Sequence, residues 1–374
     1  MTPGVTDSAP DSPLGVPTLS LQRKVYSVLT QFGRSFRGSG ARALIASRKT
    51  AIAKTAVDAL LNRGTASISF EQLRDSRHYV YLLFALTRIG AVGCSARDAH
   101  LARAWLPLKD FIKNVRINWR NPSDGVLISE STNGPRIVQI NPHYYSSHSA
   151  DYRLFTPYFA HPEFYKAGLH NDVRGMRGRE RNVRIFFAGT LSSSAYSENF
   201  GFPILSRDKV LGHVISRFES AIKAEPSDTG LRPILIVSTT DTRDIIDKHK
   251  LSMREYMHVM SRSDFFICPP GWYMPHSHNL IEAMSVGTIP ITNYHSYMRP
   301  PLTPGRNCLA FSTVEELERV VDCALCMPAG EIQRLREGVI SYYEKYMEPE
   351  SFGKELMECL PSISEVVVND ESGR

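Results

Sequence analysis

Short apolar runs alternate with stretches of helical periodicity along the second half of the chain. The apolar runs predict buried strands at residues 183–188, 233–238, 264–268 and 289–292. Apolar residues spaced for one helix face predict helices at residues 209–224, 253–261, 277–286, 313–326 and 331–346. Strands that alternate with helices are typical of a parallel sheet built from βαβ units, so this half is predicted to have an α/β fold.

The first half has a weaker pattern. Residues 79–87 are apolar and in part rich in β-forming side chains. Residues 125–129 and 136–140 predict two short strands joined by an Asn-Gly turn at Asn133. Residues 171–184 hold five arginines and two glycines, and we interpret this polar stretch as the linker between two domains.

These patterns divide the chain into four parts. We expect a disordered tail at residues 1–19, which are rich in Pro, Ser and Gly, and an N-terminal domain at residues 20–180. A C-terminal Rossmann-like domain follows at residues 181–340. Residues 341–374 are predicted to complete a terminal helix that packs back on the first domain and to end in a tail.

Composition limits the class of protein. The chain has 374 residues, of which 42% are hydrophobic and 22% charged, so it can bury a sizeable core. No apolar run approaches the ~20 residues that span a bilayer, and no apolar signal core opens the sequence. The six cysteines are sparse, and we expect a cytoplasmic protein. Cys323 and Cys326 fall on a predicted helix, where we attribute them to helix packing rather than to zinc or redox chemistry.

Charge is unevenly distributed. Residues 1–180 carry 24 Lys and Arg against 13 Asp and Glu, whereas residues 181–374 carry 20 against 25. No acidic residue occurs from Ser12 to Val57, and residues 41–62 have a helical pattern. This basic leader, residues 20–62, could bind an anionic membrane surface at the inner face of a membrane, serve as an organelle transit peptide, or pack on the first domain. No motif of a nucleic-acid-binding protein accompanies it, so we expect no nucleic acid partner.

The most informative stretch runs from Ser263 to Phe311 and combines a strand, a Pro-Pro-Gly loop, a helix and a second strand. In open parallel sheets, ligands bind at the carboxyl ends of the strands. Ser277 is placed to cap the helix, and the N–H groups of His278 and Asn279 form an anion site suited to a diphosphate. Glu282 lies about 1.4 turns after Ser277. We interpret it either as a surface carboxylate in a cleft that binds ribose hydroxyls, or as a plain helix-surface residue.

Two sequence blocks resemble GT-B glycosyltransferases, and especially the exostosin-like group. The first has the strand DFFIC, the Pro-x-Gly loop that ends at Gly271, the helix start at Ser277 with Glu282-Ala283, and the strand Gly287–Ile291. The second is RIFFAG, Arg184–Gly189, with Arg207 downstream. In the group, the strand–loop with Gly189 and Thr190, together with Arg207, is implied to approach the donor phosphates. The blocks cover about 130 residues, and His276-Ser277-His278 departs from the group's usual Ser/Arg pattern.

The resemblance implies a fold of two Rossmann-like domains that face each other across a cleft. It implies transfer of a sugar from a nucleotide-sugar donor to a glycan or lipid-linked glycan acceptor, as in polysaccharide biosynthesis. No Asp-x-Asp motif occurs, so we expect neither a metal nor another cofactor. Arg207, Lys209 and His278 would offset the charge of the leaving diphosphate.

An inverting transfer also needs a base for the acceptor hydroxyl, and we expect it in the first domain. Candidates are His161 and Glu163, in the aromatic and loop-like residues 157–165. Further candidates precede them in the chain: His143, His148 and Asp151. A retaining transfer would need no such base.

Three other interpretations stay open. A nucleotide-sugar epimerase on the same architecture would convert the donor without an acceptor. An NAD-dependent oxidoreductase could use the loop at Gly38 and Gly40, with Asp58 downstream, although no strand is predicted before this loop. A non-catalytic sugar-binding protein would bind donor and release no nucleotide.

Overall fold

A computed structural model describes residues 66–69, 81–82, 84–85, 88, 92–95, 117–118, 127–129, 137–191, 201–227, 230–238, 240, 244, 246–271 and 274–369. All of these residues belong to one compact unit that spans residues 61–374. The predicted tail, the basic leader, the Gly38 loop and the turn at Asn133 lie outside the described residues. In the described part, no helix combines the length and the apolar character that a bilayer span requires.

The second half forms a parallel sheet in which the described strands follow the order β11-β10-β9-β7-β8. These strands are β7 (Val183–Ala188), β8 (Arg232–Val237), β9 (Ser263–Cys268), β10 (Ile289–Thr292) and β11 (Leu309–Ala310). Numbered within this half, the order is 2-1-3-4-5, which is that of a doubly wound Rossmann-like sheet. The chain changes direction across the sheet between β7 and β9, and their carboxyl ends diverge there into separate loops.

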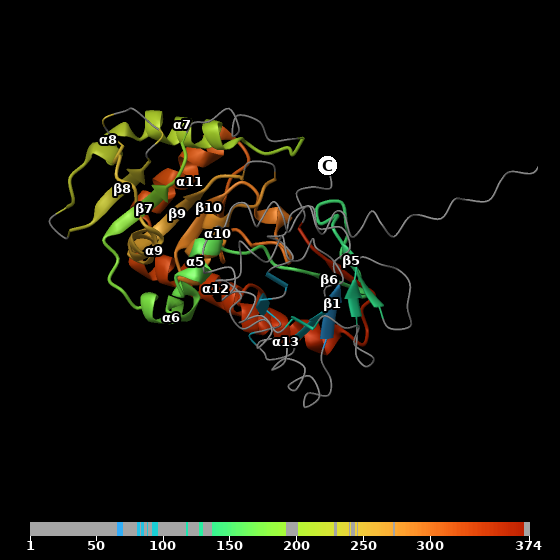
Figure 1. Cartoon of the computed structure of the whole chain (residues 1–374). Helices are drawn as coiled ribbons and strands as arrows, with labels where there is room; N and C mark the ends of the chain where they lie inside the picture. Colours follow the sequence, from blue (N-terminus) through green and yellow to red (C-terminus); the bar gives the residue numbers. More distant parts are fainter. Residues whose placement is uncertain are drawn as a thin grey trace, which may run out of the picture. The chain divides into compact units, whose positions relative to one another are not determined.

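Helices cover both faces of this sheet (Figure 1). One face packs against α7 (Arg207–Arg217), α8 (Glu219–Lys223) and α11 (Val314–Cys326). The other face packs against α9 (Met253–Ser261), α10 (His278–Ser285) and α12 (Ala329–Tyr346). Because both faces are covered, the central strands are apolar throughout: Phe186, Phe187, Phe265 and Phe266 are all fully buried.

The first half forms a second parallel sheet, with the described strands in the order β3-β2-β1-β4-β5-β12-β6. Its strands are β1 (Ala66–Ser69), β2 (Val92–Ser95), β3 (Ile117–Asn118), β4 (Leu127–Ser129), β5 (Ile137–Asn141), β6 (Arg153–Phe155) and β12 (Glu365–Val367). After α12 the chain continues through α13 (Pro349–Cys359), and β12 then pairs with both β5 and β6. The order 3-2-1-4-5 at one side is again Rossmann-like, so the predicted α/β class is confirmed.

Short helices join the two sheets along the chain. They are α5 (Pro162–Lys166), the 3-10 helix η2 (Leu169–Asn171) and α6 (Val173–Met176). The stretch interpreted as a linker, residues 171–184, therefore includes α6 and the start of β7. The aromatic stretch 157–165 is irregular only up to His161, because Pro162 opens α5.

Three local predictions are wrong. The strands at 127–129 and 137–141 pair in parallel, so no two-residue hairpin joins them. The predicted helix 209–224 is broken at Phe218 into α7 and α8. Two thiols of α11 that we expected to be packed are exposed: Cys323 and Cys326.

The apolar stretch 79–87 is helical at its described residues. Tyr81, Leu82, Phe84 and Ala85 are buried, and their spacing fits a helix face.

The loop from β9 to α10 turns back sharply on itself. The N–H of Gly271 donates to the Pro275 carbonyl oxygen at 3.2 Å. A Cβ atom at Gly271 would lie 2.3 Å from the His276 carbonyl oxygen, a separation that real structures do not tolerate. Glycine is therefore required here to bring the start of α10 beside the end of β9.

We predict that Gly271→Ala destabilises the protein by about 1–3 kcal/mol, because the added methyl group must displace backbone atoms. The matched control is Gly212→Ala, which lies on the exposed side of α7 with nothing within 4 Å of the new Cβ. That change should stabilise the protein by about 0.5–1 kcal/mol through helix propensity. Urea unfolding of the two variants measures both effects, and equal behaviour would contradict this account of the loop.

Candidate functional site

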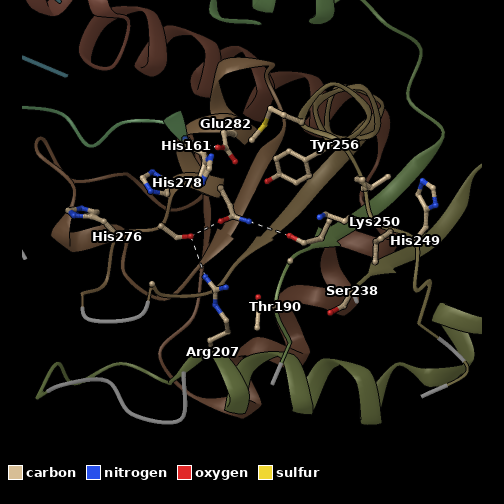
Figure 2. A pocket seen from close by; sticks show the side chains of 18 of the residues that line it. His161, Thr190, Arg207, Ser238, His249, Lys250, Tyr256, His276, His278 and Glu282 are labelled. Carbon is tan, nitrogen blue, oxygen red and sulfur yellow. Dashed lines mark hydrogen bonds between the residues drawn. The ribbon is translucent and has the colours of Figure 1, made fainter. Parts of the chain in front are cut away.

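A cavity of about 650 Å³ opens at the carboxyl ends of β7, β8 and β9 (Figure 2). This is the edge at which doubly wound sheets bind ligands, next to the change of direction between β7 and β9. Residues from the second sheet and its loops line most of the cavity, and Tyr158 and His161 line it from the segment before α5. We call residues 158–161 the bridging segment.

The first turn of α10 forms one wall of the cavity. Ser277 occupies the N-cap position, but its hydroxyl does not cap the helix and instead donates to Asn279 Oδ1 at 2.7 Å. His278 and Asn279 therefore begin the helix without a side-chain cap on their N–H groups. With the positive end of the helix dipole, such N–H groups favour an anion.

Arg207 is the cation at this wall. The side chain is only 6% exposed, and its Nε–H donates to the Pro270 carbonyl oxygen at 3.0 Å. Its Nη2 also lies 3.4 Å from Ser277 Oγ, and Asn279 Nδ2 lies 3.4 Å from the Ala188 carbonyl oxygen (Figure 2). These hydrogen bonds connect α7, the Gly271 loop, α10 and the end of β7 around the cavity.

Glu282 lines the cavity but is not the surface residue that the sequence predicts. Its side chain is 2% exposed, and Oε1 accepts a hydrogen bond of 2.8 Å from the His161 backbone N–H. Burial raises the pKa of Glu282 to about 7, although the His161 N–H favours the charged form. Burial also raises the pKa of the adjacent Tyr256, and the Glu282 carboxylate raises it further.

Two histidines of the loop and helix are fixed by residues from elsewhere in the chain. His278 Nδ1 lies 2.7 Å from the Phe159 carbonyl oxygen, and its ring stacks on Tyr158. His276 is 2% exposed; its Nδ1 lies 2.6 Å from Tyr145 Oη and 2.8 Å from Asn369 Nδ2. The edge of the cavity is thus joined to the loop after β5 and to the residues that follow β12.

The structure brings most of the predicted donor-binding residues into one cavity. Those that line it are Gly189, Thr190, Arg207, Gly271, Ser277, His278, Asn279 and Glu282. Lys209 does not line it and is exposed on α7.

Of the predicted bases, only His161 lines the cavity. Glu163 is exposed and pairs with Lys166 at 3.2 Å. The other three are exposed and lie outside the cavity: His143, His148 and Asp151.

Several cavity residues were missed by sequence reasoning: Tyr158, Ser238, His249, Lys250, Tyr256 and His276. Ser238 and Lys250 could have been found, because they follow the apolar run of β8 at the same sheet edge. Tyr158 and His276 could not, since their positions depend on contacts between distant parts of the chain. Among the described residues, no group of three His, Cys, Asp or Glu side chains is arranged to hold a metal ion.

No protein-family model and no curated protein matches this chain. Solved structures resemble it at low identity. Trehalose-6-phosphate synthase OtsA is 10% identical over 81% of this chain and 99% of its own, with a TM-score of 0.43. WaaG, a glycosyltransferase involved in lipopolysaccharide biosynthesis, is 10% identical over 80% of this chain and 100% of its own, with a TM-score of 0.37. Anabaena Alr3699/HepE in complex with UDP is 9% identical over 80% of this chain and 100% of its own, with a TM-score of 0.41. Likenesses of this degree carry no inference about activity. The strand order of the two sheets defines the fold.

The raised pKa of Glu282 predicts a specific dependence of stability on pH. A carboxyl group with an ordinary pKa of 4.5 when unfolded and about 7 when folded binds more protons in the folded state between these values. Its contribution to stability is present below pH 4.5 and is lost as the pH rises to 7. The full loss is roughly 3 kcal/mol, because one pKa unit corresponds to about 1.4 kcal/mol.

Glu282→Gln removes this titration. We expect the stability of the variant relative to wild type to increase by roughly 3 kcal/mol between pH 4.5 and pH 8, measured by urea unfolding at both pH values. Taking the difference between the two proteins cancels the titration of all other groups. A difference that stays constant with pH would contradict the buried state of this carboxyl group.

Proposed function

We propose that this protein is a glycosyltransferase that binds a nucleotide-sugar donor in the cavity of the second sheet. The observation that carries the proposal is the combination of an uncapped helix N-terminus with a buried arginine at the carboxyl edge of a Rossmann-like sheet. Backbone N–H groups and a guanidinium together suit the diphosphate of such a donor.

The pose follows from the positions of three groups. The diphosphate lies against the N–H groups of His278 and Asn279, near Arg207. Glu282, one turn further along α10, accepts hydrogen bonds from the ribose hydroxyls with the part of its carboxylate that does not bind the His161 N–H. When the sugar leaves, the helix N-terminus and Arg207 stabilise the negative charge that develops on the diphosphate.

The finer assignment rests on the sequence resemblance to the exostosin-like group. We infer a glycan or lipid-linked glycan acceptor, as in polysaccharide biosynthesis, with residues 181–340 on the donor side and residues 20–180 on the acceptor side. The acid-free basic leader supports a location in the cytoplasm at an anionic membrane surface. Sedimentation of the protein with anionic vesicles, with and without residues 1–62, tests the binding to a membrane surface.

A thermal-shift screen against UDP-, GDP-, CMP- and dTDP-sugars tests the proposal. A donor at 100 times its Kd should add about 2.7 kcal/mol of stability. Glu282→Gln should then lower the affinity for the stabilising donor roughly 10- to 150-fold, because a hydrogen bond to a charged group contributes about 1.5–3 kcal/mol.

The control for this variant is Glu331→Gln, at an exposed position in the first turn of α12, which should bind donor like wild type. If no nucleotide sugar stabilises the protein, the proposed function is wrong. If a donor binds but Glu282→Gln does not weaken it, only the ribose assignment fails. Conversion of the donor without any acceptor would instead indicate the epimerase.

We also predict that transfer does not require a divalent cation. The chain has no Asp-x-Asp motif, and Arg207 with the start of α10 provides positive charge at the place assigned to the diphosphate. The rate in excess EDTA should therefore remain within about twofold of the rate with added magnesium or manganese. Loss of activity in EDTA that manganese restores would contradict this arrangement of the phosphate site.

A further inference from the structure

Tyr256 places a buried hydroxyl group in the wall of the cavity. Its side chain comes from α9, is 8% exposed and lines the cavity. In the described part of the chain, Tyr256 Oη is closed to solvent and makes no hydrogen bond. Buried polar groups are nearly always hydrogen-bonded, because an unpaired one loses the bonds that water would give it. The unpaired hydroxyl therefore points to a state of the site in which it gains a partner.

Glu282 is the strong acceptor that this hydroxyl faces. Figure 2 shows the Tyr256 hydroxyl directed toward the Glu282 side of the cavity. Burial and the nearby carboxylate raise the pKa of Tyr256, so the hydroxyl keeps its proton and can donate it to a hydrogen bond. Two other neighbours are Asn279 and Cys268. Asn279 Oδ1 already accepts from the Ser277 hydroxyl, and a thiol is a weak acceptor, so Glu282 is the partner that can satisfy Tyr256.

The Glu282 carboxylate is itself short of donors for a buried charge. It is 2% exposed, and Oε1 accepts the His161 N–H at 2.8 Å, whereas a carboxylate offers about four lone-pair sites. Hydrogen bonds from ribose hydroxyls favour its charged form, and a charged acceptor forms shorter and stronger hydrogen bonds than a neutral one. Binding of the ribose therefore strengthens the attraction between Glu282 and the Tyr256 hydroxyl.

From this arrangement we propose that Tyr256 is a positioning residue through which the site selects ribonucleoside diphosphate donors against their 2′-deoxy counterparts. The proposal rests on the proposed function and deepens it. In the donor complex the Tyr256 hydroxyl and the His161 N–H both donate to the Glu282 carboxylate, which holds it in the orientation that accepts the two ribose hydroxyls. A 2′-deoxyribose brings one hydroxyl fewer and leaves the buried charge short of a donor. Sites built to bind a hydroxyl reject analogues that lack it.

The first test compares nucleotides on the wild-type protein. Isothermal titration at pH 8, above the pKa of Glu282, measures the Kd of UDP, GDP, CDP and ADP and of the 2′-deoxy form of each. We expect the tightest ribonucleotide to bind roughly 10- to 150-fold better than its own 2′-deoxy form, because the lost hydrogen bond is to a charged group.

The second test uses Tyr256→Phe, which removes only the hydroxyl oxygen. We expect the affinity for the ribonucleotide to fall at least about fivefold and that for the 2′-deoxy form to change less than about twofold. The midpoint of urea unfolding without nucleotide should equal or exceed that of wild type, because the hydroxyl has no partner to lose. A purely structural role would instead lower this midpoint and leave the ratio of the two affinities unchanged.

Tyr294→Phe is the matched control. Tyr294 is also fully buried, and its hydroxyl likewise makes no hydrogen bond in the described part of the chain, but the residue does not line the cavity. The variant should keep the wild-type ratio between the affinities for the ribonucleotide and for its 2′-deoxy form.

The outcomes separate this proposal from the proposed function. Equal binding of both nucleotide forms by wild type overturns the proposal while nucleotide binding stands. An unchanged affinity ratio in Tyr256→Phe, or a variant that unfolds more easily than wild type, also overturns it. If no nucleotide binds wild type, the proposed function fails, and the role of Tyr256 fails with it.

Discussion

The candidate site depends on the close return of the chain at Gly271. There is no room for a side chain between this residue and the His276 carbonyl oxygen, 2.3 Å from a Cβ built on Gly271. The return places the first turn of α10 beside the carboxyl ends of β7 and β9, and Arg207 holds both ends of the loop through Pro270 and Ser277. The uncapped helix start, the guanidinium and Glu282 face one cavity as a consequence of that packing.

The same loop and helix join the second sheet to distant parts of the chain. Glu282 binds the His161 N–H and His278 binds the Phe159 carbonyl oxygen, while His276 contacts Tyr145 and Asn369. Burial of the Glu282 carboxyl group is costly unless it is neutral or has partners, as its raised pKa reflects. Ribose hydroxyls would supply such partners, so the cost of folding this group can be offset when a donor binds.

Much of the second sheet was predictable because its signals are local. The apolar run of β7 and the helical periodicity of α9 predict the observed bounds of both elements. A buried strand and a helix face each leave a pattern in residues that are close in sequence. The parallel pairing of β4 with β5 was not predictable, because strand pattern does not encode direction. The position of β12 between β5 and β6 was not predictable either. The same holds for the burial of Glu282, because this burial depends on the bridging segment, 121 residues away in sequence.

Hydrogen–deuterium exchange with bound nucleotide tests most directly where the donor lies. Separate samples with UDP, GDP, dTDP and CMP at saturating concentration identify which nucleotide protects the protein and at which amides. We expect protection of peptides that cover Gly189 and the first turn of α10, including the N–H groups of His278 and Asn279. Strong binding of a nucleotide that leaves these peptides unprotected, with protection elsewhere, would contradict the assignment of the donor site.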